Sequence, residues 1–309
     1  MSPLHAGDQL DHYSLDSLVA TGGMATIFRA TDTQTGNPVA IKIPHPEAEC
    51  DPVFFERFRR EAEIGREMDH PGVLKVMPPV RSRRVYMAAE WVEGTSLRQI
   101  LDRGAKVPVN RARRIAASIC EALDYIHSHG VAHRDLKPEN IIVAADDSIK
   151  LLDFGIASKT GARRLTFGKF SRIMGTADYI SPEQLQGRRG DAQSDLYALG
   201  VILYEMLAGT TPFDGMNPFT VMNQRLIMKP DMSPVPRELR RIVSCAMEQN
   251  PALRYATARE LAEDVENPEE ARHAELRARP PEPKKAWLFS LAIIPASIFL
   301  LMLLVAQHQ

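Results

Sequence analysis

The sequence HRDLKPEN at residues 133–140 decides the fold, together with the tripeptide DFG at residues 153–155. The first stretch holds an acid, Asp135, and an amide, Asn140, and the second begins with another acid, Asp153. An acid beside a substrate hydroxyl, with an amide and a second carboxylate for Mg2+, is what phosphoryl transfer requires. The two stretches therefore predict a phosphotransfer site around which the rest of the chain is organised.

Both stretches match the catalytic loop and the metal-binding motif of protein kinases. The sequence resembles a bacterial, eukaryote-like (Hanks-type) serine/threonine protein kinase. The resemblance implies that Asp135 orients the attacking hydroxyl and that Lys137, typical of Ser/Thr rather than Tyr kinases, neutralises the transferring phosphoryl group. It also implies that Asn140 and Asp153 bind Mg2+, or Mn2+ in its place, and that His133 is structural.

Residues 13–43 read as three strands, with a glycine turn after the first and a hairpin after the second. In the turn, residues 20–25, two glycines let backbone N–H groups approach phosphate oxygens. Kinases have G-x-G-x-x-G here, so Ala20 and Ala25 replace the first and third glycines, and the turn alone also fits a plain β-turn. Lys42 on the third strand matches the kinase lysine that holds the α- and β-phosphates. A solvated surface lysine is the alternative.

Apolar residues recur one helical turn apart over residues 53–68, which predicts an amphipathic helix. In the family such a helix carries a glutamate that pairs with the strand lysine. Glu61 is the best match, and Glu56 and Glu63 are alternatives. A solvated helix face remains the other interpretation for all three.

Residues 85–94 resemble the last strand of the N-lobe and the hinge of a kinase. Glu90 and Val92 then offer backbone groups to adenine, and the small Ala89 leaves open a pocket behind it. The resemblance assigns twelve residues to the ATP site. They are Ala20, Gly22, Gly23, Met24, Ala25, Ile27, Ala40, Lys42, Glu61, Glu90, Val92 and Ile142.

The C-terminal half extends the resemblance. Residues 111–128 show helical spacing of apolar residues and lead into the catalytic loop. Residues 196–207 are almost wholly apolar but too few to span a membrane, so we expect a buried central helix. Ser-Pro-Glu at 181–183 stands where the family usually has Ala-Pro-Glu. By resemblance, Glu183 and Arg254 form a buried pair, and the structural residues are His133, Thr176, Glu183, Asp195 and Arg254.

Neither a zinc site nor a disulfide framework is expected. His127, His129 and His133 lie close together, but Mg2+ prefers oxygen ligands, and no Cys or carboxylate completes a zinc set. The three cysteines lie far apart and form no CxxC pair. A reducing, cytosolic setting for the folded part follows.

The segment between Asp153 and Glu183 contains two candidate phosphosites, Thr166 and Ser171. Residues 163–172 carry four basic side chains and no acid. Arg134, beside the catalytic acid, is expected to repel this positively charged segment until a phosphate makes the charge of the segment negative. Autophosphorylation is therefore the hypothesis, and a merely solvated loop is the alternative.

The C-terminal stretch differs from the rest. Residues 286–306 are uncharged over 21 positions and long enough for a transmembrane helix. Two lysines precede them, which predicts a single-pass anchor in the inner membrane, a cytoplasmic kinase domain and a short extracytoplasmic tail, residues 307–309. A buried core helix is the alternative. The charged, proline-containing residues 266–285 are expected to be a poorly folded linker.

The expected fold is an α+β bilobal kinase, with a small β-rich N-lobe and a larger helical C-lobe over residues 13–265. Residues 1–12 form an N-terminal extension with no expected signal peptide. A net charge of −1 argues against nucleic acid as a partner. The expected partners are ATP, Ser/Thr protein substrates, the membrane and a second copy for autophosphorylation. A membrane-tethered pseudokinase scaffold and a small-molecule kinase are the rival interpretations.

Overall fold

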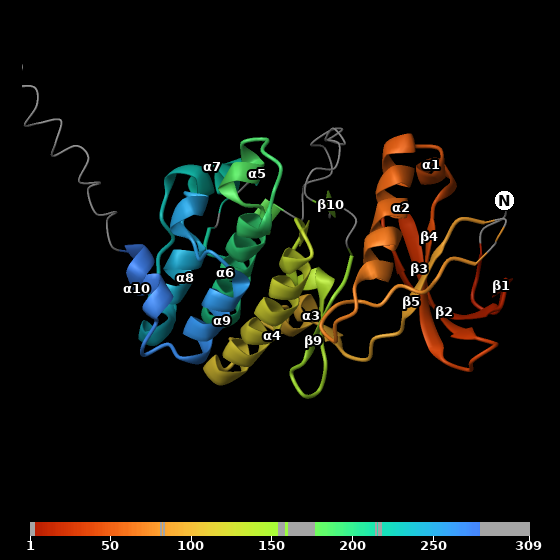
Figure 1. The fold of residues 1–309 in the computed structure, drawn as a ribbon, viewed down its shortest axis with the longest axis horizontal. Helices are drawn as coiled ribbons and strands as arrows, with labels where there is room; N and C mark the ends of the chain where they lie inside the picture. The colour runs from red at the N-terminus through yellow and green to blue at the C-terminus, as the bar shows by residue number, and fades with distance from the viewer. Residues whose placement is uncertain are drawn as a thin grey trace, which may run out of the picture.

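The computed structural model describes residues 4–80, 82, 84–153, 158–159, 177–213, 215 and 218–278. Two lobes lie side by side along the long axis of the molecule, with strands gathered in one and helices in the other (Figure 1). This is the bilobal α+β arrangement that the sequence predicts. The candidate phosphosites and residues 154–157, 160–176 and 279–309 lie outside the described residues.

The N-lobe is a five-stranded antiparallel sheet with the strand order β1-β2-β3-β4-β5. Its strands are β1 Gln9–Leu10, β2 Tyr13–Thr21, β3 Ala25–Asp32, β4 Pro38–Pro44 and β5 Met87–Glu90. The first strand belongs to the segment that the sequence assigned to an N-terminal extension. Its pairing with β2 extends the sheet by one short strand.

Helix α2, Pro52–Glu67, follows the short helix α1, Pro46–Glu49, and lies against the sheet (Figure 1). Asp51 caps α2 by accepting the N–H groups of Val53 and Phe54, and the proline at the first position already has a helical φ. Phe58 of α2 packs with Met87 and Ala89 of β5. This contact fixes the helix over the strand that leads to the hinge.

The C-lobe is built from helices around short strands. Its helices are α3 Leu97–Leu101, α4 Val109–Ser128, α5 Pro182–Leu185, α6 Ala192–Ala208, α7 Pro218–Ile227, α8 Arg240–Ala246, α9 Ala258–Glu266 and α10 Arg272–Ala278. Its strands are β6 Thr95–Ser96, β7 Val131–Ala132, β8 Ile141–Val143, β9 Ile149–Leu151 and β10 Ser158–Lys159. They form one sheet of order β6-β8-β9 and one pair, β10-β7.

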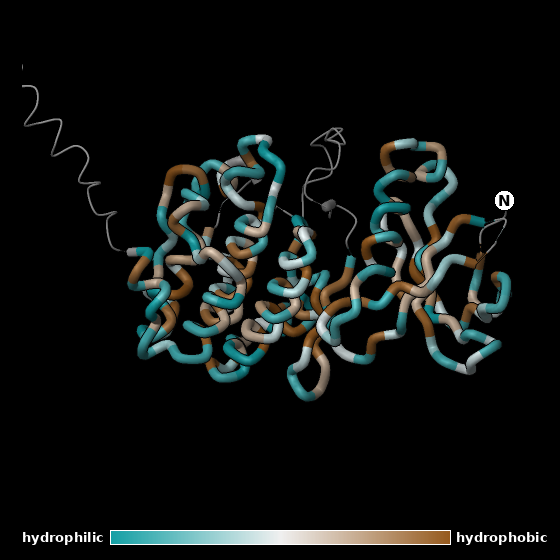
Figure 2. Tube along the Cα trace, viewed as in Figure 1, coloured by the Kyte–Doolittle hydropathy of each residue, from teal (hydrophilic) through white to brown (hydrophobic). Residues whose placement is uncertain are grey.

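Helix α6 is the centre of the C-lobe. Every residue from 194 to 208 is buried, so the prediction of a buried central helix is confirmed. Asp191 caps its first turn with a capping box, and Gly209, at φ 80°, ends it in the left-handed conformation. The hydrophobic stretches of α4 and α6 run through the interior of this lobe (Figure 2).

An extended segment, residues 72–77, is hydrogen-bonded to both lobes. At its start, Leu74 N–H donates to Leu151 O of β9 and Leu151 N–H donates to Gly72 O. At its end, Met77 N–H donates to Ala88 O of β5. The segment therefore joins a strand of the C-lobe to a strand of the N-lobe.

The predicted poorly folded linker differs from the structure over its first part, because residues 272–278 form helix α10. Buried Asp264 of α9 accepts the N–H groups of His273 and Ala274 at 3.2 and 2.8 Å. This caps and docks α10 against the C-lobe (Figure 1). No helix within the described residues is long and apolar enough to cross a bilayer, and the predicted span at 286–306 lies outside them.

Candidate functional site

Strand alternation points Lys42 at α2. Ile41 and Ile43 are buried in the core on one face of the sheet, so Lys42 between them faces the other way. Its Nζ lies 2.7 Å from Glu61 Oε1 and 3.4 Å from Asp153 Oδ1. The sequence favoured Glu61 over its neighbours as this partner, and the structure shows that pairing.

Two carboxylates share one ammonium group at this point. Burial lowers the pKa of Lys42, but the charges of Glu61 and Asp153 outweigh it, and the pKa is raised. Burial and the negative charge of Asp153 together raise the pKa of Glu61. The pair of acids therefore leaves negative charge that a further cation near Asp153 can compensate.

The catalytic loop brings Asp135, Lys137 and Asn140 together. Lys137 Nζ donates to Asp135 Oδ2 at 2.8 Å, and Asn140 Nδ2 donates to Asp135 O at 2.9 Å. Among the described residues, the Asn140 side-chain carbonyl oxygen accepts no hydrogen bond, which leaves it to act as a ligand. Leu152 N–H donates to Asn140 O, which ties the loop to the residue before Asp153.

Asp195 of α6 fixes the catalytic loop through hydrogen bonds to its backbone. Its buried carboxylate accepts the N–H groups of His133 and Arg134, at 2.8 and 2.7 Å, and contacts His127 Nε2 at 2.8 Å. Burial alone raises the pKa of Asp195, but His127 and these hydrogen bonds lower it below its ordinary value. His133 Nε2 contacts Leu152 O at 2.9 Å. His127 and His133 therefore support the loop.

Backbone strain is located at the site itself. Arg134 and Asp153 have φ values of 67° and 61°, in the left-handed region that non-glycine residues rarely adopt. Such conformations persist where the surrounding structure enforces them. Here Arg134 N–H is bound to Asp195, and Leu152, the residue before Asp153, is bound to Asn140 O. The fold therefore holds Asp135, which follows Arg134, and the candidate metal ligand Asp153 in place.

Strand register places the predicted nucleotide residues on one face of the sheet. Residues that pair directly across antiparallel strands share a face. Ala20 pairs with Ile27, which pairs with Lys42, and Ala40 pairs with Ala89. The face that carries the lysine is therefore continuous with the hinge.

The glycine turn closes on itself above this face. Gly22 N–H donates to Ala25 O at 2.9 Å, which gives a tight hairpin between β2 and β3. Met24 is exposed at the tip, and its carbonyl accepts His45 N–H. Of the predicted turn, residues 20–25, the structure leaves residues 22–24 as the exposed loop, while Ala20 lies within β2 and Ala25 begins β3.

Glu90 at the end of β5 and Val92 in the hinge, residues 91–94, are the residues predicted to offer backbone groups to adenine. Glu90 N–H donates to Lys75 O, so only the Glu90 carbonyl remains for adenine. The backbone of Val92 forms no hydrogen bond within the described part of the chain. Gly94 has φ 153°, and a Cβ there would lie 2.6 Å from Ile142 Cγ2, so glycine is required where the hinge meets Ile142.

Replacing Ala89 with methionine is expected to exclude bulky adenine-mimic inhibitors. Ala89 is buried on the face that carries Lys42, and a longer side chain there overpacks the space behind adenine. We expect inhibition constants for such compounds to rise about tenfold or more. Inhibition measured on wild type and variant checks this, with a small adenine analogue as the control. Unchanged inhibition in the variant would contradict it.

The oxygen atoms of Asn140 and Asp153 fit a magnesium ion. Mg2+ in phosphotransfer sites takes one or two protein ligands and completes its shell with phosphate and water oxygens. Within the described residues, no group of three or more His, Cys, Asp or Glu side chains could hold a metal by itself. The amide and the carboxylate therefore match a shared protein and phosphate site.

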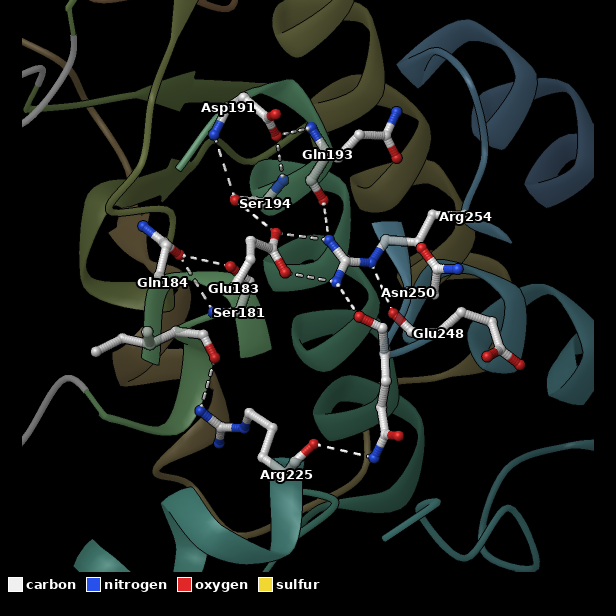
Figure 3. Close-up of polar contacts among 12 residues, drawn as sticks. Ser181, Glu183, Gln184, Asp191, Gln193, Ser194, Arg225, Glu248, Asn250 and Arg254 are labelled. Atoms are coloured by element: carbon white, nitrogen blue, oxygen red, sulfur yellow. Dashed lines mark hydrogen bonds and ion pairs between the residues drawn. The ribbon is translucent and has the colours of Figure 1, made fainter. Parts of the chain in front are cut away.

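The predicted pair Glu183 and Arg254 is present and buried (Figure 3). Two guanidinium nitrogens of Arg254 donate to the two Glu183 oxygens, each at 2.8 Å. The same guanidinium donates to carbonyls of residues 193, 248 and 249, and Ser194 Oγ donates to Glu183 Oε1. Burial raises the pKa of Glu183, but the hydrogen bonds and charge of Arg254 lower it overall.

Sequence reasoning missed the residues that hold the segment after position 176. Arg98 of α3 donates to Tyr179 Oη and Glu205 Oε1, and Tyr179 Oη donates to Glu205 Oε2. Arg225 of α7 donates to Ile180 O and to Asp178 O. No local motif marks these contacts, because they join residues far apart in the chain.

Two further arginines act electrostatically on Arg134, beside the catalytic loop. Burial and the positive charges of Arg189 and Arg60 lower the pKa of Arg134 to about 10. The Arg134 Nε also donates to Gly190 O at 2.6 Å. The sequence indicated Arg134 alone, and the fold adds Arg60 from α2 and Arg189. Thr166, Ser171 and Thr176 lie outside the described residues.

Comparison with known proteins places the chain in a family. The protein kinase domain family matches residues 13–265. The probable serine/threonine-protein kinase PknB of Corynebacterium glutamicum is 37% identical over 270 residues, covering 82% of this chain and 42% of that protein. Serine/threonine-protein kinases PknB of Mycolicibacterium smegmatis and Mycobacterium tuberculosis are 35% and 34% identical, each over 85% of this chain and 43% of the relative.

The chain therefore belongs to the protein kinase family, and its relatives are bacterial serine/threonine kinases. Protein kinases generally use ATP and Mg2+. The chain spans less than half the length of the curated relatives that it matches.

Proposed function

We propose that this chain transfers the γ-phosphate of ATP to Ser or Thr hydroxyls of protein substrates. The observation that carries the proposal is the convergence of Lys42, Glu61 and Asp153 beside the Asp135 and Asn140 loop. A scaffold without chemistry has no need to keep both the contacts of Lys42 with the two acids and the contact between Asn140 and Asp135. The two alanines in the glycine turn are the feature that favours the pseudokinase rival.

The residues divide the work of transfer. Lys42, held by Glu61, binds α- and β-phosphate oxygens. The face of the N-lobe sheet that carries Ala20, Ala40 and Ala89 covers adenine. Asp135 accepts a hydrogen bond from the substrate hydroxyl. It orients the hydroxyl oxygen in line with the bond between the γ-phosphate and ADP. Lys137 offsets charge on the transferring group. Bound Mg2+, or Mn2+, neutralises charge on the phosphate oxygens, and Asn140 and Asp153 are the residues that would hold it.

Transfer of labelled γ-phosphate by the full chain tests this proposal. Wild type with Mg2+ is expected to label a Ser/Thr protein substrate, and removal of Mg2+ by chelation should abolish the label. Lys42→Met should do the same, because it removes the phosphate contact and the partner of Glu61. ATP binding without any transfer by wild type would instead favour the scaffold, and transfer only to a small molecule would favour the second rival.

We also propose that phosphate on Thr166 or Ser171 switches the enzyme on by autophosphorylation, with a second copy of the chain as partner. The positive charges of Arg189 and Arg60 that act on Arg134 support this, because arginines bind phosphate strongly. Mass spectrometry of wild type after incubation with ATP should find phosphate between residues 158 and 176, and Asp135→Asn should lack it. Fully active protein without phosphate in that range would contradict the switch.

For the C-terminal stretch we propose a single-pass anchor in the inner membrane, formed by residues 286–306, with the kinase domain in the cytoplasm. The support is the uncharged length of the stretch and the two lysines before it. Full-length protein should stay with the membrane fraction after alkaline extraction, and a chain ending at residue 285 should not.

A further inference from the structure

Lys150 and Glu90 form an ion pair between the lobes, outside the groups assigned to catalysis. Lys150 lies on β9 of the C-lobe and Glu90 ends β5 of the N-lobe, 60 residues apart in sequence. Lys150 Nζ donates to Glu90 Oε1 at 2.5 Å and to Val73 O at 3.2 Å. One ammonium group thus bridges the end of β5 and the segment 72–77 that both lobes share.

The same carboxylate also fixes the hinge entrance. Glu90 Oε1 accepts Lys75 N–H at 2.9 Å, while Glu90 N–H donates to Lys75 O at 3.0 Å. The side chain and the N–H of Glu90 are therefore both bound to one residue of the shared segment. The residue that would offer its carbonyl to adenine is therefore held through both its N–H and its side chain.

Strand β9 connects the restrained hinge entrance to the residues assigned to phosphate and metal binding. Lys150 pairs across the sheet with Ile142, so the two side chains share the face that meets the hinge. Two residues beyond Lys150, Leu152 N–H binds Asn140 O, and Asp153 follows directly. A single short strand thus connects the hinge tie with both candidate metal ligands.

We infer that Lys150 is a positioning residue for the nucleotide: it ties the hinge to β9 and sets the spacing between the adenine and phosphate ends of the cleft. This rests on the proposed function. The side chains of Lys150 and Glu90 are 22% and 30% exposed, so water screens the pair only in part. Loss of the tie loosens nucleotide binding and leaves the groups that perform transfer in place.

The test compares Lys150→Met with wild type in the full chain, using ADP binding by calorimetry, KM for ATP, kcat and amide hydrogen exchange. The Kd for ADP and the KM for ATP are expected to rise about three- to fivefold, the range for a partly exposed ion pair. Without nucleotide, the amides of Lys75 and Glu90 should exchange faster, and kcat should change little. Lys150→Arg should restore affinity and protection.

Lys229→Met is the matched control, because Lys229 also pairs with a glutamate, Glu248, but is 80% exposed on the C-lobe. It should leave every readout unchanged. If Lys150→Met folds and keeps wild-type affinity and exchange, or loses kcat with affinity unchanged, the inference is overturned. Failure of wild type to bind ADP would refute the proposed function instead, and the exchange measurement would still decide whether the tie exists.

Discussion

Replacing Asp135 with asparagine is expected to lower kcat by about a thousandfold, the range for removal of a general base. The asparagine keeps the size of the side chain and the backbone bond to Asn140, but it has no negative charge to pair with Lys137 Nζ and cannot take up a proton. The KM for ATP should change little, because Asp135 faces the hydroxyl and not the nucleotide. Steady-state transfer to a Ser/Thr substrate with Mg2+ measures both.

Asp16→Asn serves as the control for this substitution. Asp16 is exposed on the N-lobe and accepts a bond only from Thr31 among the described residues, so transfer should stay at the wild-type rate. Thermal unfolding of each protein shows whether the domain stays intact. A rate close to wild type in Asp135→Asn would refute the assignment of Asp135 as the group that orients the hydroxyl.

Replacing Arg254 with leucine is expected to cost about 3–5 kcal/mol of unfolding free energy, as when one partner of a buried ion pair is removed. The loss leaves Glu183 charged and buried, and it strips three backbone carbonyls of their donor. For a domain of this size the melting temperature should fall by about 10 °C. Thermal and denaturant unfolding of the two proteins checks this.

The pH dependence separates the ion pair from lost packing. The pKa of Glu183 is lowered in the folded state from an ordinary value of 4.5, so its stabilisation is present above that pH and disappears as the pH falls. Glu183→Gln should therefore show a flatter loss of stability in acid than wild type.

Arg241→Leu is the control for Arg254→Leu, since Arg241 lies 4.0 Å from Glu275 with both side chains half exposed. Equal losses for Arg254→Leu and Arg241→Leu would contradict the prediction.

Local motifs were sufficient to predict the parts of the site that lie close together in the sequence. The HRDLKPEN stretch, the DFG acid and the strand lysine each follow from a few consecutive residues. The period of residues 53–68 predicted the helix, the resemblance to the family favoured Glu61 on it, and the structure places that carboxylate at Lys42. The roles of these groups in ATP and metal binding stay predictions.

Contacts between residues far apart along the chain could not be predicted from the sequence. Arg98 and Glu205 meet across 107 positions, and neither lies in a motif that the other completes. His127 was considered only as a metal ligand, since nothing local shows that Asp195 lies beside it. Helix α10 was missed because seven mostly polar residues are marginal as a helix alone, and the cap from Asp264 comes from the previous helix.

The shared segment 72–77 gives the two lobes a second connection, which is not covalent. Within the described residues the chain passes from the N-lobe to the C-lobe through residues 91–94, and the Leu151 backbone bonds and the Lys150 contacts join the lobes independently. A protease that cuts the hinge should therefore yield two fragments that still elute as one particle, and two halves produced as separate polypeptides have a surface on which to reassemble.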